Sequence, residues 1–197
     1  MKNLISVLLI FAVLVSLTGC GEIKKAEKTV IGLFEALKET NIEKVSEYMN
    51  VDDLKVEGND ENSIISNTVI IQNMFKQFDY KIISSEKKDD STVVVTAEIT
   101  NTDMKPVLSE FFTKAMQYAF SNAFSDSQDA EEESDTKIDE MFIESLNKPD
   151  LATVTNTVYI TVIKTEDKSW KVKSDDAFRN ALLGGLYEAV KDIFNGD

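Results

Sequence analysis

Apolar residues recur at helical spacing in the segment that follows residue 25. Ala26 to Lys38 carries a single apolar stripe, which predicts an amphipathic helix with one face towards a core. Thr40 and Asn41 end this pattern, and Asn41 is a suitable N-cap for a second, short helix. A third helix is predicted from about Ser63 to Phe78, although the β-branched run at residues 69–71 disfavours a helix. The domain therefore begins with helices.

The hydrophobic period changes to two at about residue 80. Residues 80–87 and 92–100 are strand-like, and the second of them alternates apolar with polar side chains. Residues 153–165 and 169–173 repeat this pattern around a turn at residues 166–168. The pattern predicts two antiparallel hairpins, each with one solvent-exposed face. The residues expected to face the core are Val93, Val95, Ala97, Ile99, Val154, Val158, Ile160, Val162, Trp170 and Val172.

Between the hairpins the pattern is helical again. A helix is predicted from Pro106 to about Phe124, because a proline costs little in the first turn. A shorter helix is predicted at residues 138–146. The polar, acidic run at residues 125–135 (SDSQDAEEESD) is predicted to be a mobile loop between them.

A final helix is predicted from a cap at Asp175 or Asp176 to about Phe194. Gly184 and Gly185 lie inside it and weaken it by about 1 kcal/mol each relative to alanine, which is consistent with either a close helix approach or a kink there. Helices, a hairpin, an inserted helical pair and a second hairpin form an α+β order.

The first twenty residues have a different character. Lys2 precedes a run from Leu4 to Leu17 in which only Ser6 and Ser16 are not apolar. This run is shorter than the roughly 20 residues of a transmembrane helix, and small residues follow it. This pattern predicts a secretory signal peptide, with a basic n-region, a short hydrophobic region and small residues at the cleavage site.

Leu17-Thr18-Gly19-Cys20 resembles the lipobox of bacterial lipoproteins. The resemblance implies that a diacylglycerol is attached to the sulfur of Cys20 and that a peptidase cuts between Gly19 and Cys20. A buried cysteine in a transmembrane helix is the alternative, and the short apolar run disfavours it. Because Cys20 is the sole cysteine, an intramolecular disulfide is excluded.

The expected organisation is a signal peptide at residues 1–19, a lipid-anchored linker at 20–25 and one domain at 26–197. Two acyl chains exceed the marginal membrane affinity of a single chain, so attachment is expected to be permanent. A linker of about five extended residues holds the domain within roughly 20 Å of the bilayer. The expected location is the outer face of the cell membrane.

The chain is strongly acidic, with 21 basic and 35 acidic residues, and residues 20–197 carry a net charge of −15. Nucleic-acid binding depends on basic side chains, so this charge argues against it. The sequence has no histidine, which excludes Ser-His-Asp and Cys-His catalysis and histidine-based metal sites. We therefore assign no catalytic residue, cofactor or metal site, and an enzyme would have to use carboxylates, Lys, Tyr or Ser.

Two short motifs resemble the NTF2-like (cystatin-like fold) lipoprotein domains of Gram-positive bacteria. One is Phe34 to Lys38 followed by Asn41 to Val45, and the other is Asp167 to Val172. The resemblance implies a curved antiparallel sheet of about four strands packed against N-terminal helices. The helical insertion at about residues 103–150 and the C-terminal helix depart from a minimal member of that family.

The same resemblance implies a cone-shaped pocket, which Tyr48, Tyr80, Tyr159 and Trp170 could line, although core packing explains these residues more simply. We expect a binding or interaction module at the cell envelope that contacts a small ligand, a peptide or an envelope protein. The alternative is an isomerase- or hydratase-type enzyme, which requires a buried Asp or Glu near a tyrosine in the pocket.

Three further features have a simple structural explanation. Glu98 could be a base, but its threonine neighbours predict a solvated strand face. Residues 126–135 could bind Ca²⁺ weakly, but they lack EF-hand spacing, which favours a solvated acidic segment. The apolar stripe could form a partner groove, but core packing is favoured. This stripe comprises Phe111, Phe112, Met116 and Phe120.

Overall fold

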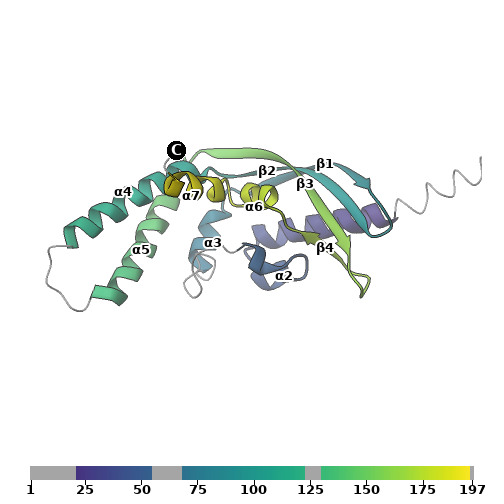
Figure 1. The fold of residues 1–197 in the computed structure, drawn as a ribbon, viewed down its shortest axis with the longest axis horizontal. Helices are drawn as coiled ribbons and strands as arrows, with labels where there is room; N and C mark the ends of the chain where they lie inside the picture. The colour runs from purple at the N-terminus through teal and green to yellow at the C-terminus, as the bar shows by residue number, and fades with distance from the viewer. Residues whose placement is uncertain (1–20, 55–67, 123–129, 196–197) are drawn as a thin grey trace, which may run out of the picture.

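The computed structural model describes residues 21–54, 68–122 and 130–195 of the chain. It has an α+β fold in which helices pack on one face of a four-stranded antiparallel sheet, with a helical pair inserted between two hairpins (Figure 1). The predicted fold class is therefore confirmed.

The sheet has the strand order β1-β2-β3-β4, so each strand pairs with its neighbour in the sequence. Every pairing is antiparallel, and a bulge between Ile82 and Ser84 shifts the register of the first hairpin. Both predicted hairpins are present with nearly the predicted ends. The strands are β1 (Asp79–Lys87), β2 (Thr92–Thr102), β3 (Thr153–Lys164) and β4 (Trp170–Lys173).

The alternation of apolar residues along the strands determines which face is buried. On β2 the side chains of Val93, Val95, Ala97 and Ile99 are fully buried, as predicted. The β3 and β4 residues predicted to face inward are also buried, except that Val154 at the start of β3 is half-buried. Except for buried Thr102, the side chains of the opposite parity on β2 and β3 are half-buried or exposed, so that face of the sheet contributes little to the core.

The N-terminal helix spans residues 21–38, so residues 21–25 of the expected linker are helical. Its buried residues Leu33, Phe34 and Leu37 pack into the core under the sheet. Asn41 caps α2 (Ile42–Ser46) as predicted, because its side chain accepts a hydrogen bond from the Lys44 N–H. A 3₁₀-helix follows as η1 (Val51–Leu54).

The third helix is shorter than predicted. α3 (Thr68–Met74) ends before Phe75, and the residues up to Phe78 form a turn that leads into β1. Phe75 and Phe78 are nevertheless buried, with their ring centroids 5.5 Å apart. Residues 63–67 of the predicted helix lie outside the described part.

The inserted helical pair consists of α4 (Met104–Asn122) and α5 (Ala130–Leu146). We call these two helices the arm, because they project from one end of the sheet (Figure 1). α5 begins eight residues earlier than predicted, so the loop prediction is wrong for residues 130–135. Alanine and glutamate are strong helix formers, and this intrinsic preference outweighs the acidic character of the segment.

The predicted C-terminal helix is divided into α6 (Asp176–Leu182) and α7 (Leu186–Asn195). Asp175 caps α6 by accepting the Phe178 N–H. Gly184 and Gly185 have φ values of 59° and 82° and lie in the turn between the helices. A Cβ atom at Gly184 would lie 1.8 Å from the Thr102 carbonyl oxygen, so this crossing requires glycine. A close helix approach or a kink was predicted, but the full break was not.

The base of the arm is attached to these C-terminal helices. The Met104 N–H donates to the Gly184 carbonyl at 2.9 Å, and the buried Asn101 amide donates to the Leu182 carbonyl at 2.7 Å. Because both bonds connect distant parts of the chain, they determine the position from which α4 leaves the sheet.

Candidate functional site

The four aromatic residues proposed to line a pocket lie in different environments. Trp170 on β4 is 6% exposed and faces the core, whereas Tyr159 on β3 is 69% exposed. Their strand parity places them on opposite faces of the sheet. Tyr48 and Tyr80 are half-buried at the edge of the core. The structure therefore does not bring all four side chains together.

Tyr48 connects three elements. Its carbonyl oxygen accepts a hydrogen bond from the Val172 N–H at 2.8 Å, and so joins the end of α2 to β4. Its ring lies over Gly32 of the N-terminal helix, so closely that a Cβ there would be 2.5 Å from the ring carbon Cζ. These contacts give Tyr48 a packing role.

Tyr80 on β1 combines a phenol with a carboxylate. Its hydroxyl donates to Glu35 Oε1 at 2.6 Å, and its ring lies 4.7 Å from that of Phe34 and 5.0 Å from the Lys38 Nζ atom. Burial, and then Glu35, raise the pKa of Tyr80 to about 12. The phenol therefore stays protonated at neutral pH and acts as a hydrogen-bond donor. The isomerase or hydratase alternative requires a buried carboxylate near a tyrosine. Glu35 lies beside Tyr80 but is exposed, so it does not meet this requirement.

The first turn of the N-terminal helix is held by charged groups from two strands. Glu22 forms ion pairs with Lys87 at the end of β1 (2.8 Å) and with Lys164 at the end of β3 (3.7 Å). Lys87 also pairs with Asp90 at 2.6 Å. The hydrogen bond from Lys87 lowers the pKa of Glu22, while Asp90 and then Glu22 raise the pKa of Lys87.

This cluster was not found from the sequence. Glu22, Lys87 and Lys164 are far apart along the chain, and each alone has the appearance of an ordinary solvated charge. In the sequence, Glu22 is distinguished from the other charged residues of this cluster by its position two residues after Cys20. The predicted lipidation and cleavage residues, Cys20 and Gly19, lie outside the described residues and remain predictions.

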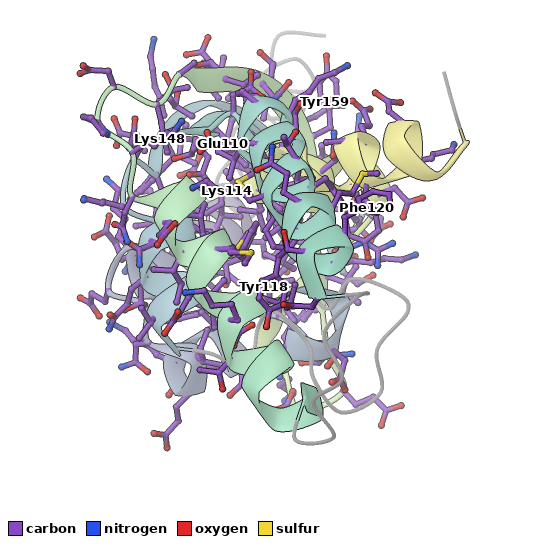
Figure 2. All side chains as sticks on the ribbon, turned by 90° about the vertical axis from the view of Figure 1, so that its left-hand side faces the viewer. Glu110, Lys114, Tyr118, Phe120, Lys148 and Tyr159 are labelled. Atoms are coloured by element: carbon purple, nitrogen blue, oxygen red, sulfur yellow. The ribbon has the colours of Figure 1, made fainter. Side chains whose placement is uncertain are left out.

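The arm has two chemically different sides. On one side Glu110 pairs with Lys114 (3.2 Å) and with Lys148, and Lys114 also pairs with Glu144 of α5 (3.3 Å). Figure 2 shows Glu110, Lys114 and Lys148 together, with Phe120 on the other side of α4. The ion pairs connect α4 to α5 and to the chain that follows α5.

The apolar stripe on α4 is divided between the core and the surface. Phe111 packs edge-on against Phe142 of α5, with ring centroids 5.2 Å apart, so core packing holds for this residue. Phe112 is half-buried. Met116 and Phe120, however, are 58% and 66% exposed, so the preferred prediction of core packing is wrong for both. They lie one helical turn apart on the same side of α4.

Other candidate positions have ordinary environments. Glu98 is half-buried on the face of the sheet away from the core, 4.0 Å from Lys81, as the prediction of a solvated strand face requires. Within the described ranges, no group of three or more acidic or cysteine side chains is arranged to hold a metal ion. None of the helices described is both long and apolar enough to span a bilayer.

Comparison with known proteins gives limited information. No protein-family model matches the chain, and no curated protein matches it in sequence. Among solved structures it is similar to one described as a "putative lipoprotein (ycdA)" from Bacillus subtilis, with 21% identity and a TM-score of 0.43. The match covers 66% of this chain and 38% of that chain. At this level of similarity the match identifies neither a family nor an activity.

Proposed function

We propose that this protein is exported, is lipid-modified on Cys20, and acts as a binding or interaction module at the outer face of the cell membrane. The observation that carries the proposal is the lipobox-like sequence Leu17 to Cys20, which is followed immediately by a folded helix. The short apolar run before it fits a cleaved export signal better than a membrane span.

The structure supports direct attachment of a folded domain to the lipid. Gly21 is already helical, and Glu22 is tied to Lys87 and Lys164. A single peptide unit, which places consecutive Cα atoms about 3.8 Å apart, joins Cys20 to this fixed turn. Acyl chains on Cys20 would therefore hold the domain close to the membrane surface.

Mass spectrometry of the native protein tests the anchor. We expect loss of residues 1–19 and addition of acyl mass to residue 20. Cys20→Ala should remove the acyl mass and leave the signal peptide uncut. Gly21→Ala is the matched control, because a Cβ there meets nothing within 4 Å, and it should be processed normally. A native protein that keeps residues 1–19, or whose Cys20 carries no lipid, would refute the anchor.

An interaction role is favoured over catalysis by the chemistry that the chain offers. The sequence has no histidine, and acylation of Cys20 would consume its thiol. The arm exposes Met116 and Phe120, and flexible methionine and aromatic side chains are common at protein contact surfaces. Site-specific photo-crosslinking from positions 116 and 120 in intact cells tests this role, with position 83 on the sheet as the comparison. Adducts at neither arm position would refute it.

A second candidate function rests on the hydrogen bond between Tyr80 and Glu35. The phenol has one proton, so it would have to turn from Glu35 to a substrate carbonyl in order to polarise it. The freed carboxylate would then move a proton, as an isomerase or hydratase requires. NMR can follow deuterium exchange at carbon positions next to carbonyl groups in a panel of ketones and enones. Exchange that is lost in both Tyr80→Phe and Glu35→Gln, but not in Tyr48→Phe, would support catalysis. Equal background exchange in all variants would rule out this catalytic function.

A further inference from the structure

We propose that the end of the domain around Glu22 lies against an anionic lipid surface and that the arm points away from it. We call this end the proximal end, and it comprises residues 22–28, 86–91 and 164–168. The inference rests on the proposed lipid anchor and adds an orientation to it. The lipid surface is the partner of the proximal end, and the arm remains available to partners farther from the membrane.

The contacts of the N-terminal helix define the proximal end. Glu22 reaches Lys87 and Lys164, so the start of this helix lies beside the turn after β1 and the end of β3. The Lys164 N–H donates to the Ser91 carbonyl at 2.7 Å, which brings the two hairpin turns to the same end of the sheet. A group attached at residue 20 is therefore next to both turns.

The arm begins at the opposite end of the sheet. β2 runs from Thr92, beside the proximal end, to Thr102, and α4 starts at Met104. At about 3.3 Å per residue, this strand places the base of the arm roughly 30 Å from Glu22. α4 adds up to about 27 Å, and Figure 1 shows the arm running away from the end where the N-terminal helix begins.

The charge distribution matches this geometry. The three segments of the proximal end contain seven lysines and seven acidic residues, so the whole net charge of −15 lies elsewhere. The two helices of the arm alone contain eight acidic residues and three lysines. An anionic surface therefore does not repel the proximal end, but it repels the arm.

The range of this repulsion favours the upright orientation. The Debye length is about 8–10 Å at physiological ionic strength, so charges beyond that distance are largely screened. In the upright orientation the acidic arm lies well outside this range. If the molecule lay flat, α5 or the acidic sides of other elements would come within it. Lys24, Lys25 and Lys28 are exposed at the proximal end and can contact lipid phosphates directly.

Energy transfer to the bilayer tests the orientation in the full-length, lipid-modified protein. Three variants each carry one introduced cysteine in addition to lipid-modified Cys20: Glu166→Cys, Tyr159→Cys and Gln117→Cys. The introduced cysteine receives a donor dye. The proteins are reconstituted in mixed phosphatidylcholine–phosphatidylglycerol vesicles that carry an acceptor lipid. The three exposed positions mark the proximal end, the middle of the sheet and the arm. Since more than about 30 Å separates the first from the last, we expect transfer to fall at least about tenfold from Glu166→Cys to Gln117→Cys.

The unmutated protein separates failure of the orientation from failure of the anchor. If the sulfur of Cys20 is in a thioether, a maleimide dye does not label this protein, and only the introduced cysteines react. Labelling of the unmutated protein would refute the anchor. Absence of labelling, together with equal transfer from all three positions or stronger transfer from Gln117→Cys, would overturn the orientation and leave the anchor standing.

Discussion

The sheet body and the arm are built differently, although both are held by buried aromatic residues. In the body, Phe34 contacts three other rings, including Tyr80 at 4.7 Å and Phe178 at 6.4 Å. In the arm, Phe111 and Phe142 contact each other at one interface between two helices. One face of α4 is left to solvent, so the difference separates a stable body from an appendage that can make contacts.

Phe34→Ala and Phe120→Ala sharpen this comparison the most. Phe34 is fully buried, so its truncation should lower the free energy of unfolding by about 3–5 kcal/mol. Phe120 is largely exposed, so the same change there should have an effect of less than about 0.5 kcal/mol. Urea unfolding followed by circular dichroism measures both. Similar losses from the two variants would show that the arm belongs to the cooperative core.

Gly184 connects the two regions, and its replacement should have the next largest effect. Gly184→Ala combines a positive φ with a clash against the Thr102 carbonyl, and should destabilise the protein by more than about 2 kcal/mol. Gly185→Ala is the matched control. Its φ is also positive but no atom lies within 4 Å, so only about 1–2 kcal/mol of strain is expected. Equal effects in denaturant titrations would show that the clash with Thr102 is relieved by movement.

Tyr80 makes the stability of the body sensitive to alkali. Its folded-state pKa of about 12 exceeds the ordinary value of 10, so its contribution is complete below pH 10 and is lost as pH rises towards 12. The loss is at most about 2.7 kcal/mol, the equivalent of two pKa units. Tyr80→Phe should remove this part of the pH dependence, whereas exposed Tyr159→Phe should not. Stability measured against pH for the three proteins decides the point.

Removal of the Glu22 charge should have the smallest effect on stability, and this effect should be confined to the proximal end. The folded-state pKa of Glu22 lies below the ordinary 4.5, so its contribution is present above pH 4.5 and is lost as pH falls through the lower value. Glu22→Gln should lower the hydrogen-exchange protection factors of the first helical turn at neutral pH. It should not show the further fall in these factors on acidification that is expected for the parent. Glu43→Gln is the control. Unchanged exchange in Glu22→Gln would show that Glu22 does not hold the turn.

The elements that were predicted correctly depend on neighbouring residues in the sequence. Asn41 and Asp175 cap helices because each side chain reaches an N–H three residues ahead. The alternation of Val93, Val95 and Ala97 specifies the buried face of β2 in the same local way. Such contacts can be inferred from sequence because the chain itself brings the partners together.

The features that were missed depend on distant residues or on a competing local preference. Neither Lys87 nor Lys164 signals that it meets Glu22, and nothing in α4 indicates that its partner helix covers Phe111 but not Met116. The extent of α5 differs from the prediction for another reason, because the helix propensity of this segment outweighs its acidic character. For the candidate site, the sequence indicated the residue types but not which of them meet.

The early start of the N-terminal helix has a rotational consequence. Because residue 21 is already helical, the peptide bond that joins it to residue 20 starts from a defined angular position about the helix axis. One residue added there as further helix would turn the domain by about 100° relative to that bond and lift it by about 1.5 Å. A flexible insertion would instead abolish the angular relation. The start of the helix at Gly21 thus determines the rotation of the domain relative to its attachment point, as well as its distance from that point.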